Sequence, residues 1–157
     1  MKLEYYFLKP GYLFITSENY IVNTILGSCV SICVYDEIKK NFGINHYILP
    51  NGIEKSAKYG NFSIPFLLKG ISELKSNLSE CKIYLIGGSV NDSQYLVGEK
   101  NVEIAKKLLN QYNLKIFKEE TGGKRGRKIS FNTYTGEIRI SKIDRGWKRW
   151  LLKKVST

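Results

Sequence analysis

The sequence predicts an α+β fold, a single-domain layered sandwich of mixed or antiparallel sheet with two main helices. Short segments with period-two alternation recur along the chain and predict about eight strands. Two longer segments carry apolar residues at helical spacing. Apolar residues make up 43% of the 157 residues, which is enough for a buried core in one domain of ordinary size.

The first four strands are predicted at residues 12–16, 20–25, 30–35 and 43–49. The third alternates between two faces, as a half-buried strand requires. Polar residues 36–41 form a connection short enough to close an antiparallel hairpin between the third and fourth strands. If that loop closes symmetrically, Cys29 lies opposite Ile48, and His46 is its diagonal neighbour on the same face.

The second half of the chain predicts two helices and four more strands. The first helix begins at Ser63-Ile64-Pro65, because proline is favoured in a first turn. Its apolar face comprises Ile64, Leu67, Leu68, Ile71, Leu74 and Leu78. The second helix presents Val102, Ala105, Leu108, Leu109 and Tyr112. Strands are predicted at 82–86, 114–118, 128–133 and 137–141, the last two joined by the hairpin turn Tyr134-Thr135-Gly136.

The chain contains one histidine, His46, which follows Cys29 by 17 residues. Histidine suits acid–base chemistry near neutral pH, and a cysteine nucleophile needs such a base because its thiolate is the attacking form. The predicted strand register brings both side chains to one face. A structural role for both residues is the alternative, since a cysteine and a histidine are only a candidate signature.

Gly27 and Ser28 immediately precede the cysteine. A tight turn there points successive N–H groups into one concavity, which would supply an oxyanion site beside a nucleophile at Cys29. The alternative is that these two residues only bend the chain between two strands.

Composition excludes several classes of protein. Three cysteines, an odd number, argue against a disulfide scaffold, and Cys33 and Cys81 are predicted to be buried packing residues. One histidine and scattered thiols give no metal-ligand spacing, so neither metal nor cofactor is expected. No apolar run suits a secretory signal or is long enough to span a bilayer, so we expect a cytoplasmic protein without membrane insertion.

The formal net charge of +11 is compatible with a nucleic-acid partner or with an acidic membrane surface. The lysines are spread along the chain, however, among many Asn, Ile and Tyr residues, a bias that an AT-rich genome also produces. The glycine-rich segment 121–128 lacks the Lys-Ser/Thr pair opening a helix that a phosphate-binding loop requires, because residues 128–131 open a strand instead. This loop is therefore not expected to bind a nucleotide. A basic nucleic-acid binder is a separate alternative function, although no nucleic acid is expected as partner.

Several of these segments together resemble one known family, the chemoreceptor glutamine deamidases of bacterial chemotaxis (the CheD family). The resemblance lies in residues 24–36, 43–50, 86–88, 121–128 and 135–137, and in Asn101 ahead of the second helix. It spans most of the chain, from about residue 12 to residue 143, and the cysteine and histidine segments together are its most specific part.

The resemblance implies a cysteine amidohydrolase without cofactor that converts receptor glutamine side chains to glutamate and releases ammonia. It implies catalytic roles for Cys29, His46 and Thr24, with Thr24 accepting the second N–H of His46. In the glycine-rich loop, it favours Gly122, Gly123 and Arg127 as residues that shape the substrate groove. The implied partners are the helical cytoplasmic region of a chemoreceptor and a response-regulator phosphatase of the CheC type.

Two parts of the chain are predicted from this comparison, a deamidase domain at 1–143 and a basic tail at 144–157. Asp144 is a candidate cap for a short amphipathic helix in the tail, with Trp147 and Trp150 on one side and cations on the other. That helix would touch an acidic partner or a membrane surface, or else pack back on the domain. For the whole protein, a regulatory binding module for the phosphatase is the alternative to an enzyme.

Overall fold

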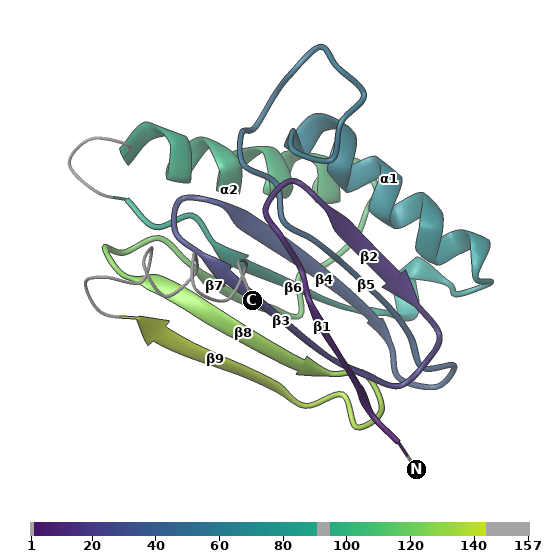
Figure 1. Cartoon of the computed structure of the whole chain (residues 1–157). Coiled ribbons are helices and arrows are strands. Elements are labelled where there is room, and N and C mark those ends of the chain that lie inside the picture. Colours follow the sequence, from purple (N-terminus) through teal and green to yellow (C-terminus); the bar gives the residue numbers. More distant parts are fainter. Residues whose placement is uncertain (1, 91–94, 144–157) are drawn as a thin grey trace.

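Two β-sheets lie face to face, and helices cover the outer side of one of them (Figure 1). The structure is a computed structural model that describes residues 2–90 and 95–143. The four-stranded sheet has the order β1 (Glu4–Phe7), β3 (Tyr20–Leu26), β8 (Gly126–Asn132), β9 (Ile138–Ile143). The five-stranded sheet has the order β2 (Leu13–Thr16), β5 (Asn41–Asn45), β4 (Val30–Asp36), β6 (Lys82–Gly87), β7 (Lys118–Thr121).

The helices of the described residues are α1 (Gly60–Glu73), α2 (Tyr95–Gln111) and a 3₁₀ turn, η1 (Leu78–Glu80). The pairs β1–β3 and β6–β7 are parallel, and the other strand pairs are antiparallel. The predicted fold class, a layered α+β sandwich with mixed sheet, is therefore confirmed.

Strand β4 separates two apolar cores. Val30, Ile32 and Val34 pack toward the helices, whereas Cys33 and Tyr35 pack toward the four-stranded sheet. The sequence alternation of β4 therefore distinguishes one core from the other. The interpretation of this segment as half-buried was wrong, because the second sheet covers the face that alternation left open.

The β4–β5 hairpin has the predicted register. Asp36 pairs with Asn41 and Cys33 with Ile44, and an isolated bridge joins Val30 to Tyr47 beyond the strand ends. Continued by one residue, this register sets Cys29 opposite Ile48. The symmetric closure of the loop was sufficient to predict it.

The helix boundaries differ from the prediction. Helix α1 starts three residues before Ser63, because the N–H groups of Gly60 and Asn61 donate to the carbonyls of Leu49 and Pro50 and so satisfy the first turn. It ends at Glu73, and Leu78 lies in η1 instead. Tyr112, predicted on the apolar face of the second helix, follows α2 and is 45% exposed.

Two edge strands were misplaced or missed. The predicted strand at 114–118 is wrong, since β7 runs from Lys118 to Thr121, and β1 was not predicted. Both are short strands at a sheet edge with no clear alternation of burial, so neither carries the periodicity on which a strand prediction depends. Among the cysteines, Cys33 is buried as predicted, whereas Cys81 is only partly buried.

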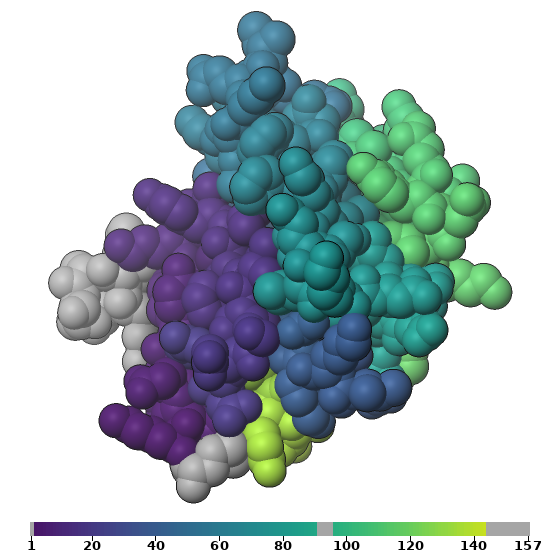
Figure 2. Space-filling model, turned by 90° about the vertical axis from the view of Figure 1, so that its right-hand side faces the viewer, coloured from purple at the N-terminus to yellow at the C-terminus, as the bar shows by residue number. Residues whose placement is uncertain are grey.

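The segment between β5 and α1 projects from one end of the molecule (Figures 1 and 2). The predicted basic tail at 144–157 lies outside the described residues. Within those residues, no helix is both long enough and apolar enough to cross a membrane.

Candidate active site

The ring of His46 lies between the two sheets, where it meets Thr24 of β3. Thr24 Oγ1 is 2.7 Å from His46 Nδ1 and 2.8 Å from the carbonyl oxygen of Leu8. A carbonyl can only accept, so the single hydroxyl proton of Thr24 is donated to Leu8. The Thr24 oxygen must then accept from Nδ1–H of His46, which leaves Nε2 as the basic nitrogen.

Burial keeps His46 neutral. The residue is 1% exposed, and desolvation lowers its pKa from 6.5 to about 3. Nε2 is buried and has no hydrogen-bond partner within the described residues. His46 therefore presents an unprotonated and unused lone pair at neutral pH.

A local interruption of the sheet accompanies His46. The N–H of Ile32 donates to Asn45 Oδ1 at 2.7 Å, so a side-chain amide replaces a ladder bond between β4 and β5. On the other side, the His46 N–H donates to Tyr12 and its carbonyl accepts from Gly11. The backbone of His46 is thus fixed by the extension of β2, while its ring extends toward β3.

Cys29 sits one residue before β4, next to the bridge between Val30 and Tyr47. Its thiol is half-buried, and burial raises its pKa from 9.0 to about 11, although its own backbone N–H lowers the pKa in part. The resting thiol is therefore protonated at neutral pH. No carbonyl among residues 2–90 and 95–143 accepts from the N–H of Ser28 or Cys29.

Gly87 and Gly88, at the end of β6, hold the turn that carries Cys29. The N–H of Gly88 donates to the Cys29 carbonyl at 2.8 Å, and that of Ser89 donates to Gly27 at 2.9 Å. Gly87 has φ +113°, and a Cβ there would lie 2.3 Å from the Cys29 oxygen. The glycine that the site needs in a left-handed conformation is therefore Gly87, whereas Gly27 does not have a positive φ.

The glycine-rich loop adjoins the same turn. The N–H of Gly122 donates to Gly87 at 3.0 Å, and the Arg127 guanidinium donates to the carbonyls of Gly122 (2.8 Å) and Gly87 (3.4 Å). Arg127 is only 3% exposed, so it ties the loop to β6 from inside. Gly123 also connects to this edge, by accepting from Val90. A role for Gly122, Gly123 and Arg127 in shaping a substrate groove stays a prediction.

Asn101 contacts the turn before Cys29, although its neighbours in the sequence indicated no role for it there. It lies within α2, not ahead of it, and its Nδ2 donates to the carbonyls of Ser28 and Ile48, each at 2.9 Å. It falls four residues before Ala105 on the buried side of the helix. A polar residue on an otherwise apolar helical stripe is the signal that could have found it.

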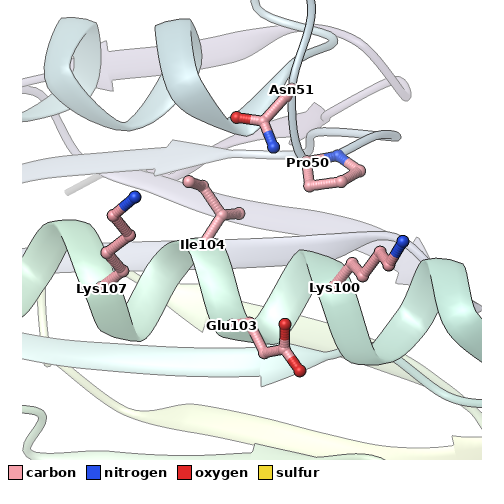
Figure 3. Close-up of a pocket in the computed structure, with 6 residues that line it drawn as sticks. All are labelled: Pro50, Asn51, Lys100, Glu103, Ile104 and Lys107. Atoms are coloured by element: carbon pink, nitrogen blue, oxygen red, sulfur yellow. The ribbon is translucent and has the colours of Figure 1, made fainter.

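A cavity of about 400 Å³ elsewhere in the structure is not lined by any of the candidate catalytic residues. It lies between α2 and the projecting loop, where Figure 3 shows Ile104 between Lys100 and Lys107, facing Pro50 and Asn51. None of its lining residues is Cys29, His46 or Thr24. Across the described residues, no three His, Cys, Asp or Glu side chains gather as a metal site would require.

Comparison with known proteins finds one matching family and several similar proteins. The family described as "CheD chemotactic sensory transduction" matches residues 49–142. A probable chemoreceptor glutamine deamidase CheD of Sulfurimonas denitrificans is 33% identical over 153 residues, covering 92% of this chain and 98% of that protein. The similar protein of Geobacter sulfurreducens, CheD 2, is 33% identical over 149 residues, covering 92% and 93%.

A third relative, the probable chemoreceptor glutamine deamidase CheD of Pyrococcus horikoshii, is 34% identical over 139 residues, covering 82% of this chain and 86% of that protein. The family match itself starts after His46. Coverage of 92% of the 157 residues leaves about 8% of the chain unaligned, however, so the first two comparisons extend over the segment from Thr24 to His46.

Proposed function

This chain belongs to the CheD family, and we propose that it deamidates glutamine side chains in the helical cytoplasmic region of bacterial chemoreceptors. The activity is that of a protein-glutamine glutaminase, the reaction for which its curated relatives are named. Each turnover replaces a neutral amide by a carboxylate, so a receptor helix gains one negative charge.

The observation that carries the mechanism is the contact of 2.7 Å between Thr24 Oγ1 and His46 Nδ1. This contact leaves Nε2 free as a base, and the pairing of Val30 with Tyr47 places Cys29 and His46 on neighbouring segments. Nε2 and the thiol share no hydrogen bond in the described structure, so we assign the approach of the two groups to the complex with substrate. There, His46 takes the proton of the Cys29 thiol while the sulfur attacks the carboxamide carbon. A carbon–sulfur bond forms, and the carbon–nitrogen bond then breaks as His46 returns the proton to the departing ammonia. Water attacks the resulting thioester with His46 again as base, which frees the thiol and leaves glutamate.

The two pKa values favour proton transfer during attack over a preformed ion pair. With the pKa of Cys29 at about 11 and that of His46 at about 3, both groups are neutral when the site is empty. Charge develops only as the tetrahedral oxyanion forms, so donors arranged for that oxyanion do most to lower the barrier. The N–H groups of Ser28 and Cys29, which have no carbonyl acceptor in the described chain, are the donors we assign to it.

The test is incubation of the protein with a soluble receptor fragment, followed by mass spectrometry and an ammonia assay. Each deamidation should add about 1 Da to the fragment and release one ammonia. Cys29→Ser should remove both signals, because an alcohol is far harder to deprotonate than a thiol. Cys33→Ala is the matched control, since Cys33 is buried in the core between the sheets, and it should retain both signals.

The same assay separates the enzyme from a regulatory module. A CheC-type response-regulator phosphatase is the second partner that we propose for this chain, and binding to it requires no turnover. If the wild-type protein bound the phosphatase or the receptor fragment but released no ammonia, the deamidase proposal would be wrong and the binding module would replace it.

A further inference from the structure

We infer that Asn101 is a positioning residue that aims the backbone N–H of Cys29 at the oxyanion formed during deamidation. This inference rests on the proposed function. Asn101 is fully buried in α2, so it does not itself meet the receptor. Its action must pass through the two carbonyls that it binds, those of Ser28 and Ile48.

The amide of Asn101 can have only one orientation. Carbonyl oxygens accept and never donate, so the nitrogen of the side chain must face Ser28 and Ile48, each 2.9 Å away. Its Oδ1 is then buried with no hydrogen-bond partner in the described chain. A buried acceptor without a partner is unfavourable and calls for an explanation beyond stability.

The contact with Ser28 fixes the peptide that joins Ser28 to Cys29. A trans peptide is planar, and its N–H points opposite to its C=O. By binding the Ser28 carbonyl on the side of α2, Asn101 therefore turns the N–H of Cys29 away from the helix. That N–H also lies close enough to the Cys29 sulfur to lower the pKa of the thiol, as an oxyanion donor beside a nucleophile should.

Other contacts hold the cysteine and histidine segments together without Asn101. Val30 and Tyr47 exchange two backbone hydrogen bonds, at 3.2 and 3.1 Å, directly beside Cys29 and His46. The Tyr47 hydroxyl also donates to the backbone carbonyl of Asn101 at 2.5 Å, and so anchors α2 independently of the Asn101 side chain. The specific contribution of the side chain is thus the orientation of the Ser28–Cys29 peptide.

The test compares two reactions of the same thiol in Asn101→Asp. The substitution preserves shape but replaces the Nδ2 group, which donates to both carbonyls, by one carboxyl oxygen that faces the two carbonyl oxygens. Deamidation passes through an oxyanion, whereas alkylation of Cys29 by iodoacetamide does not. We expect kcat on a soluble receptor fragment to fall about 10- to 100-fold, with KM within about twofold of wild type. The alkylation rate should fall much less than kcat, by a few-fold, because the Cys29 N–H lowers the pKa of the thiol only in part.

Asn41→Asp is the matched control. Asn41 is also buried and donates from Nδ2 to two acceptors, Leu74 O and Ser76 Oγ. It lies at the first residue of β5, whereas His46 follows the last residue of that strand. This control should lose stability while its kcat stays within about twofold of wild type. If Asn101→Asp does not fold, Asn101→Ser, which has one donor to share between two carbonyls, is measured in the same way.

An unchanged kcat in the Asn101 variant would overturn the inference, and so would an alkylation rate that falls in parallel with kcat, since that would indicate a general loosening of the site. Failure of the proposed function gives a different result, because the wild-type protein itself would then release no ammonia.

Discussion

The Thr24 hydroxyl determines which nitrogen of His46 can act as a base. It donates to Leu8 and accepts from Nδ1, so its loss removes the contact that fixes the tautomer. We predict that Thr24→Val lowers kcat about 10- to 100-fold, less than the loss caused by removing a buried carboxylate from a catalytic triad. Thr24→Ser keeps the hydroxyl and should stay within a few-fold of wild type.

Steady-state ammonia release by both variants, at a temperature where melting curves show them folded, checks this prediction. Equal rates for the valine and serine variants would show that the hydroxyl does not orient His46. The resemblance predicted the pairing of Thr24 with His46, but the second contact of Thr24, to the Leu8 carbonyl, could not be predicted because residue 8 lies beyond every segment that carried a signal.

Burial of His46 also makes stability depend on pH. The unfolded chain binds a proton at this residue below about pH 6.5, whereas the folded protein does so only near pH 3, because burial lowers the pKa. Stability from this residue is therefore complete above pH 6.5 and is lost as the pH falls toward 3. Relative to His46→Gln, which cannot titrate, we predict that wild type loses about 3 kcal/mol between pH 7 and pH 4.

Urea unfolding of both proteins at several pH values between 4 and 8 measures this difference. Groups that titrate in both proteins contribute equally to their unfolding free energies, so these contributions cancel in the difference and only that of residue 46 remains. A difference in unfolding free energy that stayed constant from pH 7 to pH 4 would contradict a neutral, buried imidazole.

Among the elements, the turn that carries Cys29 depends on the end of β6. A side chain at Gly87 would bring its Cβ to 2.3 Å from the Cys29 oxygen at a φ of +113°. We predict that Gly87→Ala costs about 3 kcal/mol of stability and most of the deamidase activity, since the backbone of Cys29 must shift. Gly136→Ala is the control, because Gly136 has φ +81° but a Cβ added there would approach the side chain of Tyr35 and not the backbone of Cys29.

The control should cost about 1 kcal/mol from backbone strain and leave the rate largely intact. Thermal melting and ammonia release distinguish the two variants. If both lost equal activity at equal stability, the close approach of Gly87 to Cys29 would not be what matters.

Predictability also differed between elements. The β4–β5 hairpin followed from period-two alternation and one short loop, and its register proved correct. The edge strands β1 and β7 did not, because a strand that pairs on one side and lies partly in solvent needs no apolar alternation. The start of α1 was missed because carbonyls of the preceding loop, not a capping side chain, satisfy its first turn.

For the whole molecule, the site exists because the two sheets face each other. Thr24 comes from the four-stranded sheet and His46 follows a strand of the five-stranded sheet. Asn101 binds the carbonyls of Ser28 and Ile48 from the helical layer. Local patterns predicted the layers but not which residues meet across them, since such contacts depend on how the layers stack. This is why the contacts of Asn101 emerged only from the structure.

The most direct test of the mechanism is to trap the acyl-enzyme. A receptor fragment is mixed with the protein, the reaction is quenched in acid during turnover, and the thiol-containing peptides are mapped by mass spectrometry. We predict a hydroxylamine-labile acyl adduct on the peptide of Cys29 and none on those of Cys33 or Cys81. An adduct on another residue, or deamidation by Cys29→Ser at the wild-type rate, would contradict the mechanism.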